Sequence, residues 1–146
     1  PAPGETALDM SIALDGAGGM HVGYLRRERG TLNDEQRYAR RSADGTWTFA
    51  TVVPGQRIVS SAFVLDGEGQ PHALYQRQLD DALVHAWPAA VPDADWQTEV
   101  VDDDGTGGGR VRAVFDSAGL HVTYVWDVTG GELFDKRLKY ARGCWP

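Results

Sequence analysis

One motif occurs three times in this chain, and an internal repeat limits the possible folds more than any other feature of the sequence. Each copy consists of an apolar residue, then Asp-x-x-Gly, and then His-x-x-Tyr. The copies begin at Asp15, Asp66 and Asp116, which lie 51 and 50 residues apart. Because four residue types keep their order in all three copies, the sequence indicates a structural unit that is repeated three times.

Each unit is predicted to contain four short strands. Glycine accepts a positive φ, and aspartate bonds its own backbone two residues on, so Asp-x-x-Gly predicts a hairpin turn between the first two strands. The third strands are expected at 37–39, 84–86 and 139–141, and the fourth begin at Trp47 and Trp96. Helices near 31–41 and 132–141 are an alternative. The matching segment of the middle copy is too short for a helix and is closed by Pro88, which favours strands throughout.

These units divide the chain into a lead-in or closing strand at 1–10 and repeats at 11–60, 61–110 and 111–146. In the third repeat only Cys144, Trp145 and Pro146 remain at the position of the fourth strand, which is therefore expected to be truncated. A single cysteine forms no internal disulfide and no metal cage, so Cys144 is interpreted as a small apolar residue near a strand.

The hairpin motif, the Tyr-Ala pair and the Trp-led strand together resemble a family of bacterial β-propeller-like repeats. The segment Gln70-Pro71-His72 matches that pattern best, whereas His85-Ala86 stands where Tyr-Ala is expected. The resemblance covers about residues 11 to 145. It implies an all-β propeller with three four-stranded blades in the chain, and it implies an architecture rather than one activity.

Three blades do not close a ring, because propellers have roughly four to eight. One solution is a dimer that completes a six-bladed ring, in which residues 1–10 of the same chain or of the partner complete the truncated third blade. The alternatives are another homo-oligomer or a chain that is a piece of a longer propeller.

The composition excludes some classes of partner. The net charge of −7 argues against nucleic acid and against docking on an anionic membrane, since both require a basic face. No apolar run approaches the roughly 20 residues of a membrane span, so no membrane insertion is expected. No signal peptide is visible in the sequence, yet a binding module of this kind favours an extracellular or cell-surface location.

Residues that recur in every copy are interpreted as scaffold. Three histidines (His21, His72 and His121) suggest a zinc site, but equivalent positions on different blades converge only at the innermost strand. A repeated bond that ties hairpins or blades together is the preferred interpretation. The repeated aspartates are expected to form turns, and the tyrosines of His-x-x-Tyr are expected to be core or inter-blade aromatics.

Residues that break the repeat are the candidate ligand-binding residues. In propellers, the loops that join strand two to strand three share one face with the loops between blades. A mixture of arginine, aspartate and tryptophan on that face suits a sugar, because planar polar groups bond hydroxyls and an indole stacks on the ring. Solvated loops without a ligand are the alternative. The candidates are Arg26, Arg27, Trp126, Asp127, Asp102 and Asp104.

The acidic loop that begins at Asp102 has a second interpretation as a Ca²⁺ site, but it lacks the regular spacing of an EF-hand. A solvated turn is preferred, and no cofactor, metal or catalytic residue is assigned. The sequence contains no Gly-x-Ser-x-Gly, no His-Glu-x-x-His and no phosphate-binding glycine loop, whereas a carboxylate pair for glycoside hydrolysis stays open among its 21 acidic residues. The sequence therefore predicts a non-catalytic, lectin-like module that binds a glycan or a protein; the alternative is a hydrolase or lyase with its site at the propeller channel.

Overall fold

The structure is a computed structural model that describes residues 5–28, 30, 31, 33–89, 95–104, 106, 107, 109–127 and 136–143. In this part of the chain every regular element is a β-strand, which confirms the prediction of an all-β fold. The described residues contain no helix long and apolar enough to cross a membrane.

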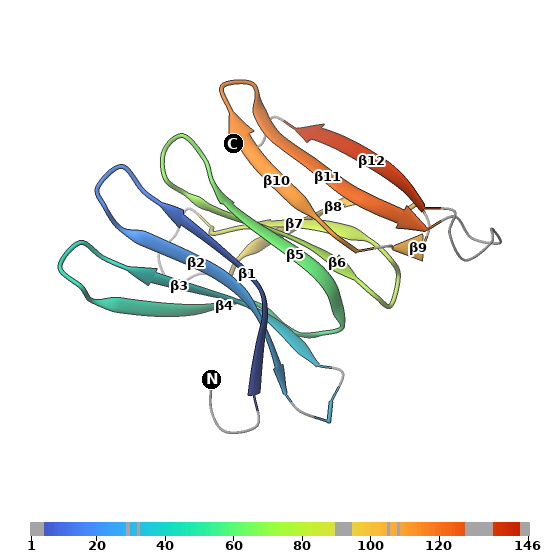
Figure 1. The fold of residues 1–146 in the computed structure, drawn as a ribbon, viewed down its shortest axis with the longest axis horizontal. Coiled ribbons are helices and arrows are strands. Elements are labelled where there is room, and N and C mark those ends of the chain that lie inside the picture. The colour runs from blue at the N-terminus through green and yellow to red at the C-terminus, as the bar shows by residue number, and fades with distance from the viewer. Residues whose placement is uncertain are drawn as a thin grey trace.

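The strands form three antiparallel sheets in chain order (Figure 1). Each sheet takes its main strands from one repeat. Sheet A contains β1 (Glu5–Leu14), β2 (Met20–Glu28), β3 (Asp34–Arg41) and β4 (Trp47–Gln56). Sheet B contains β5 (Ile58–Leu65), β6 (Pro71–Arg77), β7 (Leu83–Trp87) and β8 (Gln97–Asp102). Sheet C contains β10 (Arg112–Asp116), β11 (Gly119–Asp127), β12 (Lys136–Gly143) and the short β9 (Thr106–Gly107), which pairs with β11. Strand β9 comes from the end of the second repeat.

The third strands predicted at 37–39, 84–86 and 139–141 are confirmed as parts of β3, β7 and β12. Residues 5–10, predicted as a lead-in or a closing strand, form the first part of β1. Residues 5–8 pair with β2, and the register then shifts between Leu8 and Ser11, where Asp9 has a positive φ. The predicted start of a fourth strand at 144–146 lies outside the described residues. Within the described part of sheet C, no strand pairs with the outer edge of β12.

The hairpin turns are formed as the sequence predicted. Asp15 Oδ1 accepts hydrogen bonds from the amides of Ala17 at 3.0 Å and Gly19 at 2.6 Å. Gly18 has a φ of +83°, in the left-handed region that favours glycine. Asp66 makes the same two side-chain bonds in sheet B at 2.9 and 2.8 Å. These turns lie at one end of their sheets in Figure 1.

The sheets stack face to face, with β5 in contact with both β1 and β10. Sheet B is therefore buried on both faces, and every residue of β6 from 71 to 76 is buried. One core lies between sheets A and B and includes Leu25, Val53, Phe63, Tyr75 and Val84. A second core lies between sheets B and C and includes Leu74, Leu83, Val111, Leu120 and Val122.

The closest approach between sheets A and B occurs at Gly23. A Cβ atom placed there would lie 2.5 Å from Cβ of Phe63, which is closer than real Cβ contacts.

We expect Gly23→Ala to destabilise the fold by about 1–3 kcal/mol, because the added methyl group forces the two sheets apart. Gly67→Ala is the matched control, since no atom lies within 4 Å of its added Cβ. Urea unfolding of both variants measures the difference; equal stabilities would show that the sheets adjust freely.

Candidate functional site

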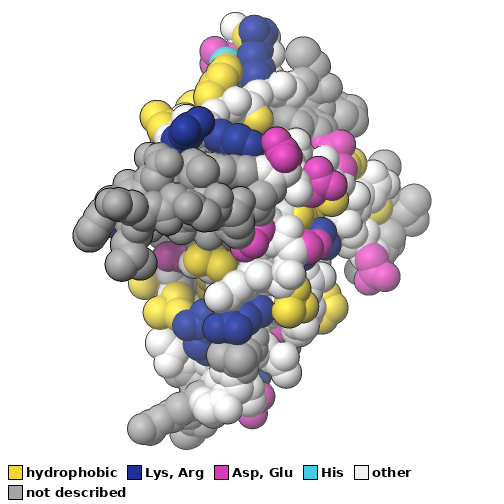
Figure 2. Space-filling model, turned by 90° about the vertical axis from the view of Figure 1, so that its right-hand side faces the viewer, with side chains coloured by type: hydrophobic (Ala, Val, Ile, Leu, Met, Phe, Trp, Pro, Cys, Tyr) yellow, Lys and Arg dark blue, Asp and Glu magenta, His cyan; other side chains and the backbone are white. Residues whose placement is uncertain are grey.

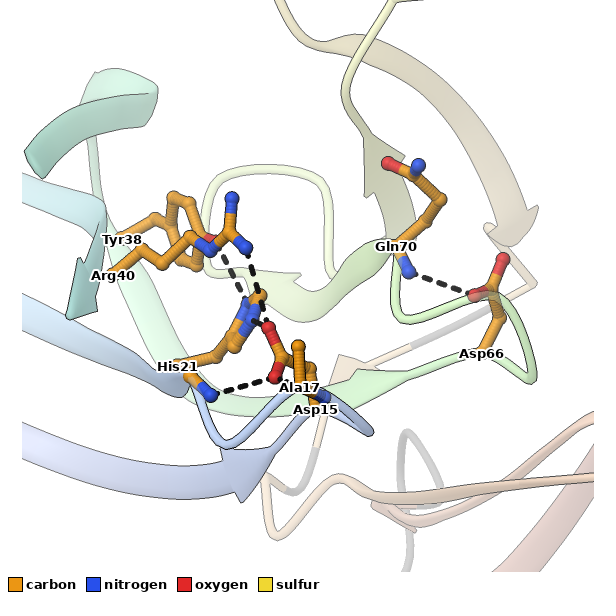
Figure 3. Close-up of polar contacts among 8 residues, drawn as sticks. Asp15, Ala17, His21, Tyr38, Arg40, Asp66 and Gln70 are labelled. Atoms are coloured by element: carbon orange, nitrogen blue, oxygen red, sulfur yellow. Dashed lines mark hydrogen bonds and ion pairs between the residues drawn. The ribbon is translucent and has the colours of Figure 1, made fainter. Parts of the chain in front are cut away.

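Each repeated histidine links the aspartate of its hairpin turn to a side chain on the third strand of its sheet. In sheet A, His21 Nε2 lies 3.1 Å from Asp15 Oδ2, and His21 Nδ1 lies 2.8 Å from the hydroxyl of Tyr38 (Figure 3). This confirms the predicted structural bond, although the tyrosine partner had not been predicted. In sheet C the same two contacts measure 2.9 and 2.7 Å and join Asp116, His121 and Tyr140.

The protons of this relay follow from its chemistry. An ionised carboxylate only accepts, so His21 Nε2 donates to Asp15 and Tyr38 donates its hydroxyl hydrogen to His21 Nδ1. The bond from His21, followed by the amide of Gly19, lowers the pKa of Asp15 to about 2. Burial raises the pKa of Tyr38 to about 12. Because both ring nitrogens of His21 are engaged in these bonds, the relay fixes the hairpin and does not present a base to a substrate.

Sheet B departs from this pattern because His85 occupies the position of Tyr38. His72 Nε2 lies 3.5 Å from Asp66 Oδ2, and His72 Nδ1 lies 2.8 Å from His85 Nε2. His85 Nδ1 in turn lies 3.1 Å from Glu99 Oε1. Both rings are buried and stack with their centroids 5.0 Å apart. The substitution that interrupts the Tyr-Ala pair thus creates a chain of four titratable groups.

This chain of four groups requires one proton more than two neutral histidines supply. Two imidazoles contribute two N–H groups to three contacts, so the third proton comes from the Glu99 carboxyl or from a charged imidazole. Burial lowers the pKa of His85 to about 3, with a further contribution from His72, and burial also lowers the pKa of His72. Burial raises the pKa of Glu99. All three shifts favour neutral imidazoles and a proton on Glu99.

A groove of about 900 Å³ opens between the hairpin turns of sheets A and B. Figure 3 shows Asp15 on one side and Asp66 on the other, with Arg40 directed toward Asp15 at 3.3 Å. Most of the polar side chains here already bond the turns or the relay. This turn groove is therefore primarily scaffold; its lining includes Asp15, Ala17, Arg40, Asp66, Glu68 and Gln70.

A second groove, of about 510 Å³, lies between β4 of sheet A and sheet B. We call it the tryptophan groove, because the partly buried Trp96 lines it and packs edge-on against Tyr38 at 5.7 Å. Planar polar groups surround the indole. The lining includes Glu35, Thr51, Gln56, Arg77, Asp95 and Thr98.

Several polar groups of the tryptophan groove are held in position. Arg77 is fixed by two bonds to Asp80, at 3.0 and 2.6 Å. Glu35 accepts hydrogen bonds from Arg26 at 2.7 Å and from Arg37 at 3.2 Å. The side-chain oxygen of Gln56 is buried and has no hydrogen-bond partner in the described part of the chain. The groove thus combines an apolar ring with oriented donors and acceptors.

The two predicted arginines lie at the end of β2, and both bond acidic residues of β3. Arg26 pairs with Glu35, whereas Arg27 makes two bonds of 2.6 and 2.7 Å to Asp34. The Asp34 carboxylate is fully buried and also accepts the amide hydrogen of Ile58, at the connection from sheet A to sheet B. Arg27 therefore neutralises a structural charge, whereas Arg26 bonds Glu35, which lines the tryptophan groove.

The predicted acidic loop lies elsewhere, at the end of β8. Asp102 accepts hydrogen bonds from the hydroxyl of Tyr124 and, at 2.8 Å, from Lys139, so it joins sheet B to sheet C. The amide of Asp104 donates to Asp102 at 3.0 Å. A Ca²⁺ ion at Asp102 would have to compete with Lys139.

Trp126 and Asp127 pair through their backbones with β9 and β12, and their side chains lie outside the described part.

Sequence reasoning did not find the tryptophan groove. Trp96 had been assigned to a strand, and Glu35 and Arg77 had received no role. The available signal was a departure from the repeat at Asp95, since Thr46 occupies the matching position before Trp47. Arg77 gave no such signal, because Arg26 stands at the same position of the first repeat. Within the described residues, no group of three or more His, Cys, Asp or Glu side chains is arranged to hold a metal ion.

Charges of both signs share the surface. Figure 2 shows basic, acidic and hydrophobic side chains interspersed on the side of the molecule that lies to the right in Figure 1.

Neither a protein-family model nor a curated protein matches this chain. The function must therefore be argued from the grooves themselves.

Arg27→Ala tests whether this arginine is structural or ligand-binding. We expect it to lower the free energy of unfolding by about 1–3 kcal/mol, because it leaves the buried Asp34 carboxylate without its charged partner. Arg26→Ala is the control and should cost less than about 1 kcal/mol, since its pair with Glu35 is partly exposed. Urea unfolding at neutral pH gives both values, and equal losses would contradict the structural role of Arg27.

His85→Tyr restores the repeat and tests the acid sensitivity of sheet B. The pKa of His85 is lower in the folded chain than its ordinary value of 6.5, so the unfolded chain takes up the proton first. Stability is then present above pH 6.5 and is lost as the pH falls toward 3. The opposing effect of Glu99 is smaller because its pKa shift is smaller.

We expect the melting temperature of His85→Tyr to fall less than that of the unmodified chain between pH 7.5 and 5.5. Each kcal/mol corresponds to about 2–4 °C in a chain of this size. Thermal unfolding at several pH values measures the slope. Parallel curves for the two proteins would show that His85 is not the acid-sensitive group.

Proposed function

We propose that this chain is a non-catalytic carbohydrate-binding module of the β-propeller type, with its ligand site in the tryptophan groove. The observation that carries the proposal is that Trp96, Arg77 and Glu35 line one groove between two sheets. A pyranose has apolar C–H faces and a rim of hydroxyls, so it requires an aromatic surface flanked by planar donors and acceptors.

The chemistry of the groove fits the two parts of a sugar. The Arg77 guanidinium, oriented by Asp80, donates to ring or hydroxyl oxygens, whereas Glu35 accepts from hydroxyl groups. Gln56 adds a carbonyl oxygen that has no partner among the described residues. Threonine hydroxyls on both walls donate and accept. Such a site holds an uncharged polyol better than a strongly charged ligand, because acids and the arginine offset each other.

The sheet arrangement supports the propeller assignment. Three repeats form successive antiparallel sheets that stack face to face, their first strands lie side by side, and their hairpin turns share one end (Figure 1). These are features of neighbouring propeller blades. We propose that the three sheets are consecutive blades and that a second chain completes the ring.

The proposed site differs from the sequence-based candidates in its position. The loop residues Arg27 and Asp102 bond structural partners, so the ligand site moves to the groove between sheets A and B. Arg26 keeps a part in it, because it orients the Glu35 carboxylate at 2.7 Å. The class of ligand, a glycan, is the same.

Trp96→Ala should weaken glycan binding at least about tenfold, which corresponds to 1.4 kcal/mol, because the stacking surface is removed. A glycan array first identifies the ligand, and isothermal titration calorimetry then compares the variants. Trp87→Ala is the matched control, since this indole stacks on His85 at 4.7 Å and does not line the groove.

Arg77→Met provides a second test that leaves the indole in place. It removes the oriented donors and should also weaken binding at least about tenfold. An array without any glycan signal for the folded protein, or unchanged affinity in both groove variants, would contradict the proposed site. Circular dichroism establishes that each variant is folded.

A further inference from the structure

We infer that two copies of this chain associate head to tail through the exposed faces of sheets A and C. The inference rests on the proposed propeller-type module and names the partner that completes it. The leading face is the outer face of sheet A, formed by Ile12, Leu14, Val22, Tyr24, Trp47 and Phe49. The trailing face is the outer face of sheet C, formed by Val114, His121, Thr123, Val125, Leu138 and Tyr140.

The leading face carries exposed apolar side chains of β1 and β4, and Arg37 and Arg41 of β3 share this face with them. Ile12 is 66% exposed, Leu14 is 70% exposed and Phe49 is 64% exposed. Trp47 stacks on Phe49 with ring centroids 6.1 Å apart, which keeps a flat aromatic surface directed outward. Large exposed apolar patches mark interaction sites on soluble proteins.

The repeat identifies what covers the leading face. The corresponding face of sheet B is buried against sheet A within the chain. Phe63, at the position of Ile12, is only 5% exposed, and Tyr75, at the position of Tyr24, is 1% exposed. Sheet C buries the same repeat positions against sheet B, at Ala113, Phe115, Val122 and Tyr124.

The trailing face is the other half of the same contact. Val114 is 59% exposed, Leu138 is 75% exposed and Tyr140 is 59% exposed. Their counterparts in sheet B are inside the second core or beside it: they are Val64, Leu83 and His85. Within the chain, a leading face thus packs on a trailing face twice, between sheets A and B and between sheets B and C. The leading face of sheet A and the trailing face of sheet C have no such neighbour among the described residues.

Side-chain sizes also match across this contact. Between sheets A and B, the large Phe63 faces Gly23, which has no side chain. Between sheets B and C, the large Leu74 stands at the repeat position of Gly23, and the small Ala113 stands at the repeat position of Phe63. Both belong to the second core. At the open ends these positions hold Thr123 and Ile12. A second copy would therefore again place a larger side chain opposite a smaller one, as close packing requires.

The geometry points to two copies rather than an open chain of copies. A head-to-tail contact either closes a ring or continues as a fibre. Two copies contribute six sheets, within the range of roughly four to eight blades in propellers, whereas three copies would contribute nine. A closed dimer covers every leading and trailing face.

Light scattering coupled to size exclusion tests this inference. We expect the 146-residue chain to have about twice its 15.9 kDa mass in solution. Ile12→Arg on the leading face and Val114→Arg on the trailing face should each halve that mass, because each buries an unpaired charge in the contact. Leu79→Arg is the matched control and should remain dimeric, since Leu79 is 86% exposed and lies outside both faces.

A charge pair tests the head-to-tail direction. By the repeat, Ile12 of one copy faces Thr123 of the other, as Phe63 faces Gly23 within the chain. We therefore expect Thr123→Asp to restore the dimer when it is combined with Ile12→Arg. A monomeric unmodified chain, or an Ile12→Arg variant that remains dimeric, would overturn the inference. Failure of the charge pair to restore the dimer would overturn the head-to-tail direction.

Glycan binding separates this inference from the proposed function. The tryptophan groove lies within one chain, so the monomeric Ile12→Arg variant should keep the affinity of the dimer. If the unmodified chain is monomeric and still binds the glycan, only the inferred association is contradicted. A dimer that binds no glycan would remove the proposed ligand and leave the association in place.

Discussion

Burial of sheet B between sheets A and C is the interaction on which the rest of the structure depends. A four-stranded sheet from one repeat leaves two broad faces exposed, so a single repeat does not form a core of its own. Here both faces of the middle sheet are buried against its neighbours, and β6 is buried from 71 to 76. The outer repeats each bury one face in the same way. Both the stability of the chain and its exposed apolar ends follow from this arrangement.

The hydrogen-bonded relays make each sheet a rigid unit that can be stacked. An aspartate fixes the turn, a histidine bonds that aspartate, and a residue of the third strand bonds the histidine. In sheets A and C a tyrosine hydroxyl completes the relay. In sheet B, His85 replaces it and adds a buried titratable group, which is the physical reason why we expect the middle sheet to be acid-sensitive.

The junction between two sheets is also where chemistry becomes available. Within one sheet, polar side chains such as Arg27 and Asp34 bond each other and leave little for a ligand. Where sheet A meets sheet B, residues from separate repeats converge around Trp96 without all satisfying one another. The stacked sheets thus separate the repeated scaffold from the proposed site, which lies where residues of two repeats meet.

The sequence by itself determined the repeat, the strand order, the aspartate turns and the all-β class, because these depend on contacts between residues close in the chain. It also singled out the interrupted Tyr-Ala pair at His85. Only the tertiary structure decided that Arg26 orients Glu35 and that Arg27 neutralises the buried Asp34. It alone placed Trp96, Arg77 and Glu35 in one groove, since the stacking of two sheets, rather than any spacing along the chain, brings those residues together.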